Sequence, residues 1–199
     1  MTEHIYASEH PETTHVRPGG FTLWFTGLSG SGKTTIAHLV GPELDRRGLV
    51  VEYLDGDNVR MHLSKGLGFS KEDRDAHVER LGWVASRITR HGGAVIVAAI
   101  SPYEQARKNA RALVEDHGPF VEIHVTTSLE ECARRDVNGL YAKAFAGEIK
   151  GFTGVDDPYE APQNPEIVVD TEGLSPEESA AFVVSRLEEL GLVPAKVTA

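Results

Sequence analysis

A phosphate-binding motif near the N-terminus constrains this chain more than any other feature. It matches the pattern G-x-x-x-x-G-K-[ST] at every fixed position and reads Gly27-Leu28-Ser29-Gly30-Ser31-Gly32-Lys33-Thr34. An apolar run with β-branched and aromatic residues precedes it at 21–26, and residues 35–40 can continue as a helix. Strand, glycine loop and helix in this order predict a site for a nucleoside triphosphate with Mg²⁺, because a chance glycine turn rarely shows the full match in this context.

The residue types of the loop fit the chemistry of a polyphosphate. Glycines have no Cβ and allow backbone dihedrals that turn successive N–H groups towards one anion. Lys33 is the residue that reaches the β and γ phosphates in such loops, and the Thr34 hydroxyl is a ligand of Mg²⁺. The helix that begins near Lys33 adds the positive end of its dipole. The residues expected to bind ATP here are Gly27, Ser29, Gly30, Ser31, Gly32, Lys33, Thr34 and Thr35.

Length and composition favour a single α/β domain. A chain of 199 residues can bury one sizeable core and is short for two. Its 40% hydrophobic and 25% charged residues exclude a collagen-like chain, a fully disordered chain and a disulfide scaffold. Cys132 is the single cysteine, so no internal disulfide can form, and a cytoplasmic location is expected.

Charge and hydropathy limit the kinds of partner. The formal net charge of −10 argues against a nucleic-acid partner, since backbone phosphates require a basic surface. No apolar run reaches the roughly 18 residues of a membrane span, and no basic-then-apolar segment opens the chain, so neither a membrane span nor a secretory signal is predicted. A small anionic ligand is compatible with this charge, because a few arginines can set the potential inside a cleft.

Three regions follow from the pattern of elements. Residues 1–20 are polar and aperiodic, which predicts a flexible N-terminal tail; its His4, His10 and His15 have no common metal-ligand spacing. Residues 21–192 are the predicted domain and 193–199 a C-terminal tail. Strands alternating with helices predict an α/β fold of the P-loop nucleotide-kinase type, a doubly wound parallel sheet of five strands. The predicted strands span 21–26, 49–54, 94–100, 120–125 and 166–169.

Residues 138–160 interrupt this alternation with several glycines and prolines, among them the basic positions Lys143 and Lys150. So long an irregular segment inside a compact domain is usually functional. We expect a lid that excludes water during phosphoryl transfer, with Phe152 near glycine hinges. A surface insertion without a role is the alternative.

Ligands of a parallel sheet bind at the carboxyl ends of its strands, where the loops after the first three predicted strands meet. Asp55 and Asp57 follow the second strand, and they are the carboxylates expected to hold Mg²⁺ or to take a proton from an attacking hydroxyl. The alternative is an Asp-Gly turn that merely ends a strand. The loop after the third strand begins with Ser101.

Arginines supply the expected contacts to an anion. Arg60, Arg74 and Arg80 are spaced to project towards the same side, and a guanidinium fork suits a bidentate phosphate or sulfate. An ordinary surface arginine is an equal alternative for each of them. Phe69 either stacks on a base or belongs to the core, and His77 lies on the helix with Arg74 and Arg80.

At these residues the chain resembles the adenylylsulfate (APS) kinase family, whose members phosphorylate the 3′-hydroxyl of adenosine 5′-phosphosulfate. The resemblance covers residues 20–192, and its most specific motifs are Asp55-Gly56-Asp57-Asn58 and Phe152-Thr153-Gly154. The matching stretches are 25–34, 54–60, 67–70 with 73–74, 100–103, 135–137, 139–141, 146–154 and 159–162.

The resemblance implies roles for individual residues. Asp57, with Asp55 beside it, would act on the acceptor hydroxyl and on Mg²⁺, and Ser101 would lie near the transferring phosphate. The catalytic residues would be Lys33, Asp55, Asp57 and Ser101, and the metal ligands Thr34 and Asp57. The acceptor site would comprise Asp57, Arg60, Phe69, Arg74, His77, Arg80, Ile100, Lys150 and Phe152. Arg135, Ala161 and Pro162 would border the adenine of ATP, and a homodimer is expected.

Four positions depart from the family pattern. His77 stands where asparagine is usual, Glu79 where arginine is usual, Asn138 replaces a lysine and Phe145 stands where arginine is common. Three of these changes lower the positive charge. One charge at roughly 4 Å is worth up to about 4 kcal/mol at an effective dielectric of about 20, which is enough to change the choice of acceptor.

The favoured hypothesis is ATP-dependent phosphorylation of APS to 3′-phosphoadenylyl sulfate. The four departures motivate a second hypothesis, a related kinase that phosphorylates another nucleotide or a small alcohol. A nucleotide-binding module without turnover is the third. The joint presence of Lys33, Thr34, Asp55, Asp57 and Arg60 speaks against that module.

Overall fold

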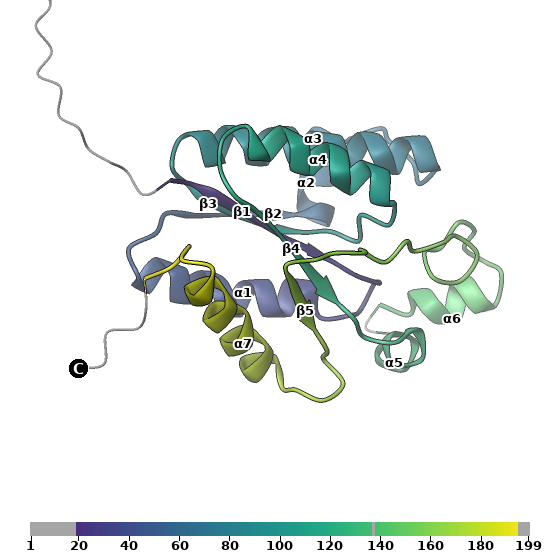
Figure 1. Cartoon of the computed structure of the whole chain (residues 1–199). Coiled ribbons are helices and arrows are strands. Elements are labelled where there is room, and N and C mark those ends of the chain that lie inside the picture. Colours follow the sequence, from purple (N-terminus) through teal and green to yellow (C-terminus); the bar gives the residue numbers. More distant parts are fainter. Residues whose placement is uncertain (1–18, 137, 195–199) are drawn as a thin grey trace, which may run out of the picture.

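A computed structural model describes residues 19–136 and 138–194, which form a parallel five-stranded sheet between two layers of helices (Figure 1). The predicted doubly wound α/β fold is therefore confirmed. The strands are β1 Phe21–Thr26, β2 Val51–Asp55, β3 Ala94–Ala98, β4 Phe120–Val125 and β5 Ile167–Val169. The helices are α1 Lys33–Arg46, α2 Gly56–Leu63, α3 Lys71–Arg90, α4 Glu104–Glu115, α5 Leu129–Arg135, α6 Leu140–Phe145 and α7 Pro176–Glu189.

The strand order is β2-β3-β1-β4-β5, so the strand before the glycine loop lies in the middle of the sheet. Helices α1 and α7 pack on one face, and α3 and α4 cover the other (Figure 1). Leu23 and Trp24 are adjacent in β1, belong to the cores on opposite faces and are both fully buried. Two covered faces explain why β1 and β3 are apolar without alternation.

Two helices of the structure were not predicted. Helix α2 begins at Gly56 because the Asp55 side chain accepts hydrogen bonds from the N–H groups of Asp57 and Asn58, at 3.0 and 3.3 Å. Because the sequence Asp-Gly is typical of a turn, Asp55 was not recognised as the N-cap of a helix. Helix α6 lies within the segment predicted to be irregular, so that expectation was wrong for residues 140–145.

Serine caps set the starts of three further helices. Ser70 and Ser128 accept hydrogen bonds from N–H groups three residues ahead, and Ser175 forms the complete capping box with Glu178. At Ser128 the reciprocal contact comes from elsewhere, because its N–H donates to the Glu172 carboxylate at 2.8 Å. All three serines therefore cap their helices, but only Ser175 forms the reciprocal box with the residue three positions ahead.

The folded part is slightly longer than predicted at both ends. A Cβ on Gly20 would lie 2.3 Å from the Thr89 carbonyl oxygen, so this residue belongs to the packed domain and not to the tail. Val193 is 4% exposed and belongs to the core beside α7. The remaining predicted tails, with His4, His10 and His15, lie outside the described residues. Among residues 19–136 and 138–194, no helix is long and apolar enough to cross a membrane.

Candidate active site

The glycine loop between β1 and α1 folds as its sequence predicts. Gly27, Gly30 and Gly32 have φ angles of 153°, 74° and 102°, a range that residues with a Cβ rarely adopt. Lys33 is buried and donates a hydrogen bond from Nζ to the Leu28 carbonyl at 2.6 Å. Burial lowers the pKa of Lys33 to about 8. An anion in the loop therefore favours the charged form of this lysine.

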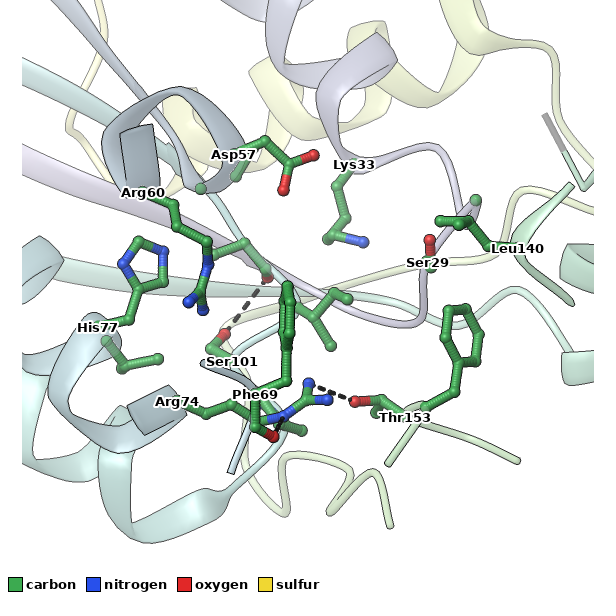
Figure 2. A pocket seen from close by; sticks show the side chains of 18 of the residues that line it. Ser29, Lys33, Asp57, Arg60, Phe69, Arg74, His77, Ser101, Leu140 and Thr153 are labelled. Carbon is green, nitrogen blue, oxygen red and sulfur yellow. Dashed lines mark hydrogen bonds between the residues drawn. The ribbon is translucent and has the colours of Figure 1, made fainter. Parts of the chain in front are cut away.

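Two cavities meet at the loop. The first cavity has a volume of about 490 Å³ and extends towards α2, α3 and residues 138–153 (Figure 2). The second cavity has a volume of about 420 Å³ and lies between the loop, Arg135 and the start of α7. Gly30, Lys33 and Thr34 line both. Both volumes suit small molecules, so two ligands can reach the same lysine from two directions.

The first cavity brings together most of the residues predicted for catalysis and for the acceptor. They come from the carboxyl ends of β1, β2 and β3, from α2 and α3, and from the segment predicted as a lid. Those lining it are Ser29, Gly30, Lys33, Thr34, Asp55, Asp57, Arg60, Phe69, Arg74, His77, Ile100, Ser101, Lys150 and Phe152.

Asp55 and Asp57 have different surroundings. Besides capping α2, Asp55 accepts a hydrogen bond from the Thr34 hydroxyl at 3.1 Å. The Asp57 carboxylate accepts no hydrogen bond from residues 19–136 or 138–194, and it lies near Lys33 in the first cavity (Figure 2). Asp55 is thus engaged with the glycine loop, while Asp57 is left for a ligand.

Arg60 and Arg74 both lie close to the exposed ring of Phe69. Their guanidinium carbons are 4.8 and 5.6 Å from the ring centroid. Within the described residues, neither arginine forms an ion pair with a carboxylate. Burial and the positive charge of Arg74 lower the pKa of Arg60. Two such unneutralised guanidinium groups favour a ligand that carries negative charge.

Arg80 does not join this pair. It is exposed on α3 and donates from Nη1 to the Leu63 carbonyl at the end of α2, at 2.6 Å. It therefore lies outside the first cavity, because its hydrogen bond directs the guanidinium to the outer end of α2.

The lid segment, defined as residues 138–160, is docked onto the rest of the first cavity. Arg74 donates hydrogen bonds to the Thr153 hydroxyl at 2.8 Å (Figure 2) and to the Gly151 carbonyl at 2.5 Å. The Tyr141 hydroxyl donates to the Ser29 carbonyl of the glycine loop at 2.9 Å. The lid segment is therefore connected both to an arginine of the first cavity and to the phosphate-binding loop.

His77 is attached to the end of α2. Its Nδ1 is 2.8 Å from the hydroxyl of Ser64, the residue after the helix. Burial, helped by the Arg60 guanidinium, lowers the pKa of His77 to about 4. The imidazole is thus neutral near pH 7 and stabilises the helix that carries Asp57.

We expect the stability of the protein to depend on pH through His77. The pKa of His77 is about 6.5 in the unfolded chain and about 4 in the folded protein. Between these two pH values the unfolded chain binds a proton at this residue and the folded protein does not. The contribution of His77 to the free energy of unfolding is therefore complete above pH 6.5 and falls, by about 3 kcal/mol in all, as the pH drops to 4.

Urea unfolding at pH 7 and at pH 4.5 tests this expectation. The His77→Asn variant should lose less stability between the two values than the wild type, by about 2 kcal/mol or more. His62→Asn, at an exposed position of α2, is the matched control and should behave as the wild type. Equal pH dependence in all three proteins would contradict the assignment.

Ser101 forms part of the cavity wall in an unusual conformation. Its φ of 40° is strained for a residue other than glycine. The hydroxyl accepts a hydrogen bond from Trp24 Nε1 at 3.0 Å and donates to the Ala99 carbonyl at 3.3 Å (Figure 2), and the Ser101 carbonyl accepts from Arg107 at 2.8 Å. These contacts occupy the hydroxyl that was expected near the transferring phosphate, and they favour a positioning role.

The second cavity contains part of the predicted adenine site. Thr35 and Arg135 line it together with Thr171, and Arg135 Nε donates to the Glu131 carboxylate at 2.9 Å. Ala161 and Pro162 line neither cavity. The preceding Glu160 is attached instead to the start of α4, since its N–H donates to the Pro102 carbonyl and its own carbonyl accepts from Arg107, at 2.8 and 2.7 Å.

Several residues of the site had no predicted role. Thr127 follows β4 and Thr171 follows β5, each by two residues, and both contact the glycine loop. The rule that ligand sites lie at the carboxyl ends of strands would have found them if it had been applied to all five strands. Thr153 and Tyr141 have no such signal, because their contacts depend on the position of the lid segment.

Comparison with known proteins gives a consistent result. The sequence profile of the family described as adenylylsulphate kinase matches residues 19–170. The adenylyl-sulfate kinase of Picosynechococcus sp. is 56% identical over 174 residues, which are 87% of this chain and 97% of that protein. A probable bifunctional SAT/APS kinase 2 of Sorangium cellulosum is 55% identical over 175 residues; this match covers 88% of this chain and 30% of that longer protein.

A solved structure is similar over the same region. The APS kinase of Mycobacterium tuberculosis in complex with AMPPNP and APS has a TM-score of 0.82 and 46% identity, over 86% of this chain and 99% of that one. The part matched by the profile contains the glycine loop and all the residues that line the first cavity. The chain belongs to the adenylylsulphate kinase family.

Proposed function

We propose that this chain transfers the γ-phosphoryl group of ATP to the 3′-hydroxyl of APS and so forms 3′-phosphoadenylyl sulfate. The observation that carries the proposal is the meeting of two cavities at Lys33 and Thr34, with Asp57 and the pair Arg60 and Arg74 on the side of the first. The names of the similar proteins support the choice of substrates, since the Mycobacterium tuberculosis enzyme is described with AMPPNP and APS.

ATP occupies the second cavity in this proposal, with its polyphosphate in the glycine loop. The backbone N–H groups of the loop and the Lys33 ammonium stabilise negative charge on the phosphates. Arg135, which lines the second cavity, lies beside the base. A buried lysine is suited to this role, because electrostatic interactions are stronger where water is excluded.

APS occupies the first cavity. Arg60 and Arg74 neutralise its phosphosulfate, and the exposed ring of Phe69 provides a surface for its adenine. Phe152 of the lid segment lines the same cavity and packs edge-on against Tyr141, with ring centroids 4.9 Å apart. The Asp57 carboxylate accepts the proton of the 3′-hydroxyl as the phosphoryl group is transferred.

Mg²⁺ accompanies ATP in this proposal. The Thr34 hydroxyl and the Asp55 carboxylate are hard oxygen donors, 3.1 Å apart at the start of α1, and they fit a cation that is usually held by one or two carboxylates and by substrate phosphates. When bound, Mg²⁺ neutralises charge on the β and γ phosphates. We therefore assign Asp55 to the metal, whereas the family resemblance implied Asp57.

A different acceptor was the main alternative, and the geometry weakens its basis. Of the four departures, only His77 and Asn138 line the first cavity, whereas Glu79 and Phe145 are exposed outside it. The charge of Glu79 is therefore screened by solvent before it can act on an acceptor. A homodimer and a cytoplasmic location remain predictions.

ADP release with ATP, Mg²⁺ and a panel of acceptors tests the proposal. APS should support rapid turnover at micromolar concentration, whereas AMP and the nucleotides of cytidine and uridine should give only background hydrolysis. Turnover of another acceptor with background rates for APS would favour the second hypothesis. No ADP release with any acceptor, from a protein that still binds ATP, would favour a binding module.

A further inference from the structure

The carbonyl of Ser31 in the glycine loop is held from outside by a chain of hydrogen bonds. The Thr127 hydroxyl donates to this carbonyl at 2.8 Å, and the Thr171 hydroxyl lies 3.3 Å from it and within hydrogen-bond distance of the Thr127 hydroxyl. Arg135 Nη1 lies 3.1 Å from the Thr171 hydroxyl. Thr127 is only 4% exposed, so its hydroxyl has little access to water as a substitute partner.

The donors of this group all serve the Ser31 carbonyl. An arginine can only donate, so Thr171 accepts from Arg135, whose Nη1 is also 3.5 Å from the Ser31 carbonyl. Thr127 gives its single proton to the Ser31 carbonyl, and the single proton of Thr171 is then available for the Thr127 oxygen or for the same carbonyl. Hydrogen bonds in such a series polarise one another, and here a positive charge stands at the start of the series. The Ser31 carbonyl is therefore a strongly held acceptor.

The position of this carbonyl determines the direction of the next N–H group. Ser31 and Gly32 share one planar trans peptide, in which C=O and N–H point in opposite directions. A carbonyl held towards Thr127 and Thr171 leaves the Gly32 N–H on the inner side of the loop, where phosphate binds in the proposed function. The φ of 102° at Gly32 is what allows the chain to enter α1 from this peptide.

We propose that Thr127 and Thr171 are positioning residues for ATP, which orient the Ser31–Gly32 peptide through this hydrogen-bond chain. The proposal rests on the second cavity being the ATP site of the proposed function. Neither threonine lines the first cavity, so their effect should be confined to the nucleotide that occupies the loop. They link the ends of β4 and β5 to a loop that follows β1.

Removal of one hydroxyl at constant side-chain volume is the direct test. Thr127→Val should raise the Kd of a non-hydrolysable ATP analogue, measured by calorimetry with Mg²⁺, by about five- to tenfold, as expected for the loss of a buried hydrogen bond. The KM for ATP should rise in parallel, whereas the KM for APS should stay within about twofold. Thr127→Ser keeps the hydroxyl and should restore most of the affinity.

Two further variants separate this role from a general effect on folding. Thr126→Val is the matched control, because Thr126 is the neighbouring residue and bonds the Val169 carbonyl instead of the glycine loop. It should leave the Kd unchanged. Thr171→Val should weaken the analogue as Thr127→Val does, and the double variant should be little worse than either, since both belong to one chain of bonds.

Wild-type affinity in both Thr127→Val and Thr171→Val would overturn the proposal, as would equal losses in Thr126→Val and Thr127→Val. A rise in the KM for APS as large as that for ATP would also overturn it. The Kd measurement does not depend on the identity of the acceptor. If the chain binds the analogue but does not phosphorylate APS, the proposed acceptor is wrong. The calorimetric comparison still decides the role of the threonines in that case.

Discussion

Lys33→Met should lower kcat by about 10³-fold while the protein remains folded. Methionine keeps the apolar stem of the side chain and removes the ammonium group, which in the proposed function stabilises charge on the transferring phosphoryl group. The loss should appear mainly in kcat, because charge develops most strongly in the transition state. Steady-state ADP release with ATP, Mg²⁺ and APS measures it.

The expected stability of Lys33→Met makes this prediction sharper. Burial lowers the pKa of Lys33 to about 8, which means that the charged ammonium group destabilises the folded protein. The variant should therefore unfold in urea at the same concentration as the wild type or a higher one. Lys108→Met, an exposed lysine paired with Glu104 on α4, is the matched control and should keep full activity. Substantial turnover by Lys33→Met would contradict the assigned role.

Asp57→Asn should lower kcat by about 10²- to 10⁴-fold, the range for loss of a general base. The Asp57 carboxylate accepts no hydrogen bond within the described residues, so the amide breaks no contact and the free energy of unfolding should stay within about 0.5 kcal/mol of the wild type. The KM values for both substrates should change little. Single-turnover measurements would separate the chemical step from product release.

Asp55→Asn is the informative comparison, because the neighbouring carboxylate has other contacts. It caps α2 and accepts from Thr34, and because asparagine caps a helix about as well as aspartate does, the free energy of unfolding should stay within about 0.5 kcal/mol of the wild type. The variant should, however, raise the Mg²⁺ concentration needed for half-maximal activity, which Asp57→Asn should not do. If the two variants exchanged these effects, Asp55 would be the residue nearer to the reacting hydroxyl.

The parts of the site that could be predicted are those set by local sequence. The glycine loop has a fixed spacing, and β1 and β4 have the predicted bounds because each is a short run rich in β-branched and aromatic residues beside clear loop signals. Arg60, Phe69 and Arg74 meet as expected, since α2, the following turn and α3 are adjacent in the chain. Residues so close in the chain can adopt few relative positions, so their proximity could be predicted.

The parts that could not be predicted depend on contacts between distant segments. Arg80 has the spacing of a cavity residue, yet its hydrogen bond to Leu63 turns it outward. The hydroxyl of Ser101 is occupied by Trp24, which is 77 residues away in the chain. The Glu160 carbonyl accepts a hydrogen bond from Arg107 of α4, and the next two residues, Ala161 and Pro162, line neither cavity. No local pattern contains these partners.

The hydrogen bond between Trp24 and Ser101 gives the protein a built-in optical reporter. The chain has two tryptophans, and Trp83 is 57% exposed on α3, whereas Trp24 is fully buried and contacts the wall of the first cavity. With Trp83 replaced by phenylalanine, the remaining emission comes from one indole whose N–H reports on the Ser101 turn. Occupation of that cavity can then be followed by fluorescence in real time, without a label and without turnover.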